Sequence, residues 1–130
     1  MGLQIASIQQ CQSLEQFYDG LKTSTNSSTA SVGCTMLDFL PLLIDVCKDR
    51  DIWALPSRDC LWLLPGDDWT SRWLVSVIGC GGRFQIAYRL PAAAAPWSDA
   101  MVSGQAVDAA DAACMVRIAI DRCDGWPCPG

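Results

Sequence analysis

The chain has 130 residues, of which 51% are hydrophobic and 18% charged, with 14 acidic residues against 9 basic ones and a formal net charge of -5. This length suits a single domain with one core, and this composition is that of a globular chain and not of a disordered one. The acidic excess repels phosphate backbones, so it argues against nucleic-acid binding and favours encounter with a basic partner. We therefore expect one globular domain spanning residues 1–130.

The N-terminal segment, MGLQIASIQQCQSLEQF, has no basic region followed by a long apolar one. We therefore expect no signal peptide. No apolar run reaches the length that a membrane-spanning helix needs, so we also expect no membrane contact. A cytoplasmic location follows as a prediction. In that reducing compartment the eight cysteines would be free thiols that pack as small hydrophobic side chains.

In the N-terminal third, the sequence predicts a short strand, from a weak signal, and a helix. Residues 2–8, GLQIASI, alternate weakly and indicate a short strand. Ser13 with Gln16 three residues later has the pattern of a capping box, which predicts a helix from Leu14 to about Lys22. The small, polar residues 23–33, TSTNSSTASVG, are typical of a loop.

A second helix is predicted from Asp38 to Asp49. Asp38, Asp45 and Asp49 are spaced at i, i+7 and i+11, within about 20° of one line on a helix, and the apolar residues cluster opposite them. One interpretation of this acidic stripe is a solvated helix face. The other is a surface that docks onto a basic groove, which Asp51 just beyond the helix would extend.

Four short apolar runs follow, at residues 51–56, 60–65, 72–79 and 83–90. The last, RFQIAYRL, alternates with a period of two, and the turn sequences PGDD and GCGG separate neighbouring runs. This spacing predicts an antiparallel meander of three to four strands. Residues 103–125 predict a closing helix capped by Ser103, with its apolar stripe on the residues Val107, Ala110, Cys114 and Ile118. The predicted fold class is α+β, with N-terminal helices, the meander, and a C-terminal helix packed on the sheet.

The chain lacks the usual residues of catalysis. It has no histidine, which removes the commonest general base and the Ser-His and Cys-His nucleophile pairs. No two cysteines form a C-x-x-C pair, so we expect no metal site and no cofactor. Asp67 and Asp68 are adjacent carboxylates, but a catalytic pair would need a cleft and a raised pKa on one member. Turn residues need neither, so we expect no enzyme.

The tryptophans divide into two groups. Trp53, Trp62 and Trp73 fall within strand-like runs and are expected in the core. Trp69 follows Asp67 and Asp68 in a turn, and Trp97 and Trp126 stand beside prolines. An exposed tryptophan next to carboxylates is common at protein interfaces, although each could instead fold back on the core. The residues predicted to bind a partner are Asp38, Asp45, Asp49, Asp67, Asp68 and Trp69.

In its size, its acidic charge and its expected α+β layout, the chain resembles bacterial immunity proteins as a type, that is, small proteins that neutralise a cognate toxin. This resemblance implies occlusion, in which an acidic surface covers the active site of a basic toxin or effector without chemistry. One alternative is a phage or mobile-element inhibitor that masks a nucleic-acid-binding protein. Another is a small enzyme or ligand-binding domain with a pocket built from aspartates and from the residues Arg72, Arg83, Tyr88 and Arg89.

Overall fold

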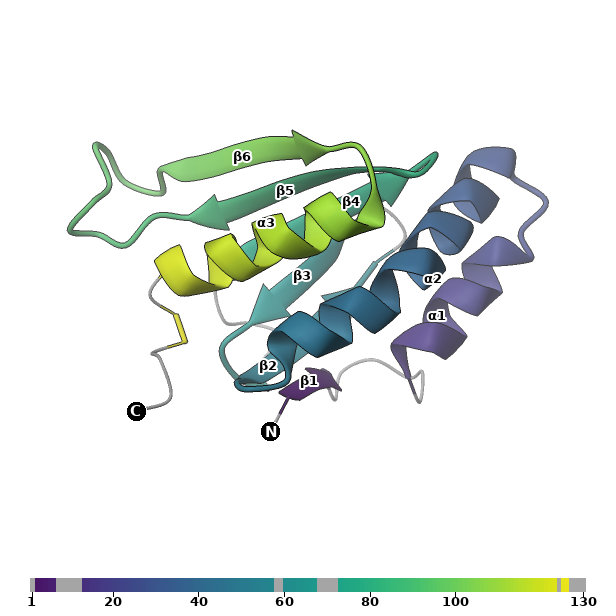
Figure 1. Cartoon of the computed structure of the whole chain (residues 1–130), viewed down its shortest axis with the longest axis horizontal. Helices are drawn as coiled ribbons and strands as arrows, with labels where there is room; N and C mark the ends of the chain where they lie inside the picture. The colour runs from purple at the N-terminus through teal and green to yellow at the C-terminus, as the bar shows by residue number, and fades with distance from the viewer. Residues whose placement is uncertain (1, 7–12, 58–59, 68–72, 124, 127–130) are drawn as a thin grey trace.

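The computed structural model describes residues 2–6, 13–57, 60–67, 73–123 and 125–126. In these residues the elements follow in the order β1 (Gly2–Ile5), α1 (Leu14–Lys22), α2 (Ser27–Cys47), β2 (Asp51–Pro56), β3 (Leu61–Leu64), β4 (Val75–Cys80), β5 (Arg83–Arg89), β6 (Met101–Ala106) and α3 (Ala109–Arg122). The α+β class is confirmed. The helices pack together on one side of the sheet (Figure 1).

The sheet differs from the predicted meander of three to four antiparallel strands. It has six strands in the order β1-β2-β3-β4-β5-β6 within the described residues, and β1 pairs with β2 in parallel. The remaining neighbours are antiparallel. The helices α1 and α2 form the crossover between β1 and β2, and a crossover of this length is what allows two strands to run parallel.

The last strand, β6, lies where the sequence predicted the start of the closing helix. Residues 101–106, MVSGQA, pair with residues 84–89 of β5, and the helix begins only at Ala109. Its cap is Asp108 and not Ser103. The Oδ1 atom of Asp108 accepts a hydrogen bond from the Asp111 N–H at 2.8 Å. The predicted apolar stripe is also wrong, because the stripe that faces the sheet consists of Ala112, Ala113, Val116, Ala119 and Ile120.

Helix α2 begins eleven residues before the predicted start, inside the predicted loop. Asn26 caps it by accepting a hydrogen bond from the Thr29 N–H at 3.1 Å. The small residues belong to a close helix contact: a Cβ atom placed on Gly33 would lie 2.6 Å from the Tyr18 carbonyl oxygen and 2.8 Å from the Lys22 Cα. Only a residue without a side chain lets the backbones of α1 and α2 approach so closely.

By length and composition α2 could cross a membrane, with a mean hydropathy of 1.6 over its best window. The prediction that no stretch is long and apolar enough is therefore wrong by this criterion. Buried core helices of soluble proteins pass the same criterion, and 39% of the window is buried inside the fold. Phe39, Leu40 and Leu43 of α2 are at most 1% exposed, within the core. The cytoplasmic location stays a prediction.

The prediction that Trp53, Trp62 and Trp73 lie in the core is wrong, because all three are only half-buried and none belongs to the core. Trp53 and Trp62 alternate with the core residues of β2 and β3, so they point to the face of the sheet away from the helices, where they are half-buried. Trp73, also half-buried, precedes β4. Trp97 is 70% exposed, whereas Trp126 is only 6% exposed and packs into the core.

Candidate partner-binding surface

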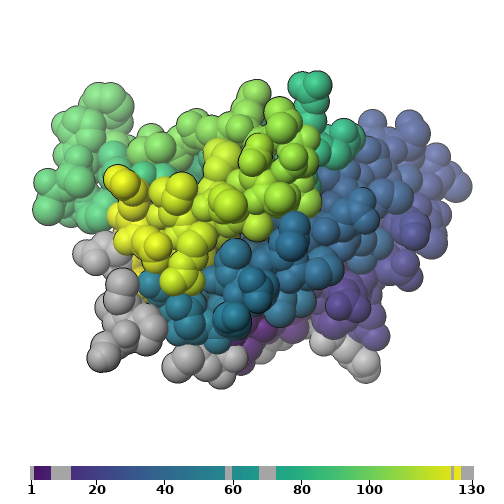
Figure 2. Space-filling model, in the orientation of Figure 1, coloured from purple at the N-terminus to yellow at the C-terminus, as the bar shows by residue number. Residues whose placement is uncertain are grey.

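The outward face of α2 carries acidic and apolar side chains together. Asp38, Leu42 and Asp45 follow one another at i, i+4 and i+7, so they share one side of the helix. All three are exposed, Leu42 to 39%. We call the side chains of Asp38, Leu42 and Asp45 the α2 ridge. Figure 2 shows α2, in blue, between α1, in purple, and α3, in yellow-green.

The charges of the ridge are accessible to solvent. Asp45 approaches Lys48 at 3.4 Å between Oδ1 and Nζ, and both side chains are more than 70% exposed. Such a surface pair contributes at most about 1 kcal/mol and is easily exchanged for another partner. Asp38 makes no ion pair with any residue that the structure describes. The ridge therefore presents two carboxylates that a cationic partner can reach.

Asp49, the third acid of the predicted stripe, has a different environment. Its two carboxylate oxygens accept hydrogen bonds from Nη1 and Nη2 of Arg117 at 2.9 and 3.1 Å. This hydrogen bonding lowers the pKa of Asp49 below its ordinary value. Arg50 and Asp121 complete a cluster, since Arg50 Nη2 lies 2.8 Å from Asp121 and Arg117 Nε lies 3.6 Å from it. Asp49 thus ties the junction between α2 and β2 to α3, and its charge is balanced within the fold.

The second predicted contact, at the turn after β3, is described only in part. Asp67 is exposed in this turn. The pairing of Trp53 with Leu64 places the turn at the end of the sheet where α2 leads into β2. Asp68 and Trp69 lie outside the described residues. The fold therefore brings Asp67 to the same end of the molecule as Asp45 and Asp49, although the three are distant in sequence.

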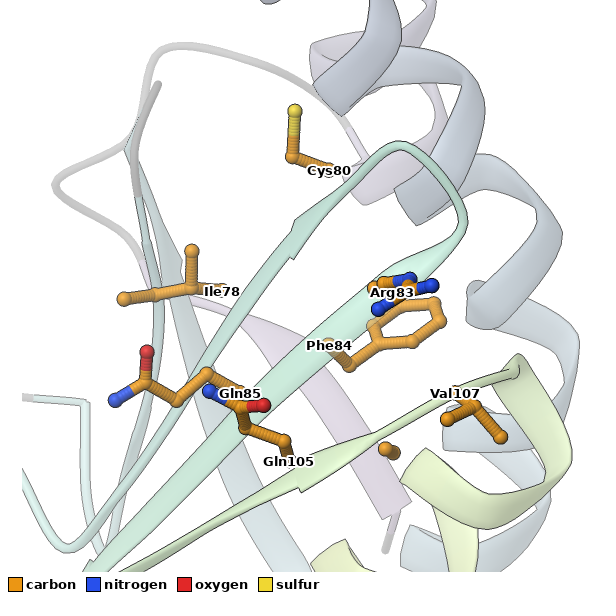
Figure 3. Close-up of a pocket in the computed structure, with 8 residues that line it drawn as sticks. Ile78, Cys80, Arg83, Phe84, Gln85, Gln105 and Val107 are labelled. Carbon is orange, nitrogen blue, oxygen red and sulfur yellow. The ribbon is translucent and has the colours of Figure 1, made fainter.

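A hollow of about 250 Å³ beside the β4–β5 hairpin and β6 does not assemble a catalytic group. Figure 3 shows Gln85 and Gln105 side by side on neighbouring strands, near Ile78, at this hollow. No carboxylate lines it, and its charged side chain is that of Arg83. A general acid and base pair therefore has no counterpart there.

The described residues of the predicted Asp/Arg/Tyr pocket do not line one hollow: Arg83, Tyr88 and Arg89 line three different ones, and Arg89 shares its hollow, of about 650 Å³, with Asp99. Tyr88 and Arg89 are consecutive in β5, so their side chains point to opposite faces of the sheet. Arg89 is held by Trp73: its Nε donates to the Trp73 carbonyl oxygen at 2.7 Å, and its guanidinium lies 4.3 Å from the centre of the Trp73 ring. It also pairs with Asp99 at 3.7 Å. Arg72 lies outside the described residues.

The thiols and carboxylates that the structure describes do not gather into a metal site, because no three of them lie close enough to hold an ion. Cys47 is buried, and this burial raises the pKa of its thiol to about 12. A thiol held protonated in this way is a poor nucleophile and a poor metal ligand. Cys34, Cys80 and Cys114 are exposed, against the prediction that the cysteines pack inside.

Searches against protein-family models, curated proteins and solved structures gave no match to this chain.

Proposed function

We propose that the chain is a non-catalytic protein that binds a basic protein partner through the α2 ridge and blocks that partner's active site. The observation that carries this proposal is an exposed leucine, Leu42, with exposed Asp38 and Asp45 one turn away on either side. Interfaces commonly combine such an apolar centre with a polar rim. In this proposal the chain acts like an immunity protein, by covering a toxin or effector.

The charge and the apolar centre have separate roles in this proposal. The net charge of -5 attracts a cationic partner and speeds encounter, an effect that added salt screens. Leu42 supplies apolar area that leaves water on binding, which mainly slows dissociation. Asp67 would extend the contact at the end of the sheet near Asp45. Asp68 and Trp69 stay predicted contacts from the sequence alone. Asp49 contributes less than the sequence suggested, because Arg117 already neutralises it.

The test begins with capture of a partner from the source cell on the immobilised chain, followed by binding kinetics with the purified partner. We expect Asp38→Lys and Asp45→Lys to slow association and to weaken its dependence on salt. The control is Asp19→Lys, which makes the same charge change at an exposed position on α1. If the control slows association as much as the ridge variants do, net charge and not the ridge controls capture.

Leu42→Ala tests the apolar centre. We expect a clearly faster dissociation rate with only a small fall in melting temperature, because Leu42 is 39% exposed and lies outside the fully buried core. Ile44→Ala is the matched control, since Ile44 is 46% exposed on the same helix but lies beside β1 and α1. If the Leu42→Ala variant dissociates from the partner at the wild-type rate, the ridge is not the docking surface. The activity of the captured protein, assayed with and without the chain, then tests occlusion.

A further inference from the structure

We propose that the chain forms a two-fold symmetric dimer in which β6 pairs antiparallel with β6 of a second copy, centred on Ser103. The two sheets would join into one, with the helices of both copies on the same side. This proposal goes beyond the binding function above and does not depend on it, because it uses residues of β6 and α3, whereas the ridge lies on α2.

β6 is an edge strand without the usual protection against pairing. It is hydrogen-bonded to β5 on one side, and no described element lies beyond it on the other (Figure 1). Its sequence, MVSGQA, contains no charge and no proline. Natural edge strands usually carry a lysine, a proline or a bulge, or lie under another element, because bare backbone groups invite a further strand. By contrast, the opposite edge strand, β1, has only four residues.

The register of β6 with β5 fixes which backbone groups point outward. The Leu90 N–H donates to the Ala100 carbonyl oxygen at 3.0 Å, and the same register pairs Tyr88 with Val102. Antiparallel strands alternate between pairs that exchange hydrogen bonds and pairs that do not, so the even-numbered residues of β6 bond to β5. Met101, Ser103 and Gln105 therefore direct their N–H and C=O groups away from the sheet.

A second copy of β6 satisfies these outward groups. With a two-fold axis through Ser103, Met101 of one copy lies opposite Gln105 of the other, and Ser103 lies opposite its own counterpart. Each of these positions exchanges two hydrogen bonds, which gives about six across the joint. On the helix side, Val102 of one copy meets Gly104 of the other, a large residue against a small one. The strand is thus complementary to itself.

The exposed apolar side chains gather at this same edge. Of the eight large apolar residues of the described chain that are exposed, four lie on β6, just after it or on the facing helix: Met101, Val102, Val107 and Ile118. Together with Met115, Val102 and Ile118 also line a hollow of about 320 Å³ between α3 and the edge of the sheet. Concentrated apolar surface on a small chain indicates a contact site.

Helix α3 supplies the charge pattern that selects a second copy. Asp111, Met115, Ile118 and Arg122 follow at i, i+4, i+7 and i+11, within about 60° of one another on the helix. Met115, Ile118 and Arg122 line the hollow beside β6. The stripe therefore faces the edge of the sheet with an acid at one end, apolar residues in the middle and a base at the other end.

The midpoint of this stripe on α3 lies at the same level along the strand as Ser103, the midpoint of the proposed pairing of β6. The Met115 Cε atom lies 2.8 Å from the position of a Cβ on Gly104, while Ile118 lines the same hollow as Val102. A two-fold axis through Ser103 thus passes between the levels of Met115 and Ile118. The axis then places Asp111 of each copy across from Arg122 of the other. Two independent patterns, one in the backbone and one in the charges, agree on the same partner.

The two copies of α3 would flank the joint rather than pack directly on each other. Since α3 packs mainly on β5, with β6 and β4 on either side, three strand spacings, about 14 Å, separate its axis from that of its counterpart. Directly packed helices lie 8–10 Å apart, so the long side chains of Met115, Ile118 and Arg122 make the contact over the joined strands.

The test measures the mass of the chain in solution by light scattering and sedimentation over a wide range of concentrations. We expect the apparent mass to rise with concentration from 14.1 kDa toward twice that value. Ser103→Pro removes an outward N–H without removing a bond to β5, so it should leave a folded monomer. Ser103→Ala keeps the N–H and should dimerise like the wild type. A monomer at every concentration overturns the proposal, and so does a dimer that Ser103→Pro leaves intact.

A charge exchange on α3 tests the partner without altering the strand. Arg122→Glu places two acids across the joint and should weaken the dimer at low salt. Adding Asp111→Lys to Arg122→Glu restores opposite charges across the axis and should recover dimerisation. If the single variant dimerises as well as the wild type, or if the double variant fails to recover while its circular dichroism stays native, the two-fold arrangement is wrong. The edge of β6 would then pair with a different surface of the chain or with a peptide from another protein.

Discussion

The contact between α1 and α2 provides a direct test of the packing, through the substitution Gly33→Ala. Gly33 is buried in α2 where the helix crosses the C-terminal turn of α1. A new Cβ would lie 2.6 Å from the Tyr18 carbonyl oxygen and 2.8 Å from the Lys22 Cα. These are backbone atoms of α1, so a side-chain rotation cannot relieve the overlap, and the two helices must separate.

Two effects of opposite sign set the magnitude. Replacing a glycine inside a helix by alanine gains about 1 kcal/mol from helix propensity. Overpacking a tight contact costs about 1–3 kcal/mol, and more where only backbone can move. Separation of the helices also loosens Tyr18, which is 1% exposed in the core. We expect a net loss of about 2 kcal/mol in the free energy of unfolding, or roughly 5–10 °C in melting temperature for a chain of this size.

The assay is urea unfolding followed by circular dichroism, with Gly20→Ala as the control. Gly20 is an exposed residue of α1, and no heavy atom lies within 4 Å of the position its Cβ would take. The same substitution there should stabilise the fold by about 0.5–1 kcal/mol, because only the propensity gain remains. If Gly33→Ala stabilises the fold as much as Gly20→Ala does, the close approach of α1 and α2 is refuted.

Two further predictions concern the pH dependence of stability. Because Arg117 lowers the pKa of Asp49, this pair stabilises the fold above the ordinary pKa of 3.8 and loses its effect as the pH falls below it. Asp49→Asn should therefore be less stable than the wild type at neutral pH and approach it near pH 2. Acid-unfolding curves of Asp49→Asn and the wild type that run parallel would contradict the role given to Asp49. Burial raises the pKa of Cys47 from 9.0 to about 12. The protonated thiol therefore contributes fully to folding stability below pH 9. This contribution is lost between pH 9 and 12, because there the thiol ionises in the unfolded chain but not in the folded one. Cys47→Ala should lower stability at neutral pH but flatten the alkaline decline measured by chemical unfolding, and an unchanged slope would place this thiol in contact with water.

The sequence was sufficient where a local signal agreed with the final environment. Ser13 accepts a hydrogen bond from the Gln16 N–H at 3.1 Å and starts α1 at Leu14, as the capping pattern predicted. Strand β5 spans Arg83–Arg89 with Phe84 and Ile86 buried, as the period of two predicted. The turn before it contains two glycines with positive φ, which is the conformation of a tight hairpin.

Tertiary contacts decided the rest, because the same local sequence suits two environments. MVSGQA has no strong pattern of its own, and it becomes a strand because β5 offers it an edge to pair with. The small polar residues before Gly33 suit a loop equally well, but they form a helix because α1 packs against them. Asp38, Asp45 and Asp49 are equivalent by spacing, and only the approach of Arg117 from α3 separates Asp49 from the other two. Charge, length and alternation are properties of the chain alone, whereas pairing and burial depend on which distant segment arrives beside each residue.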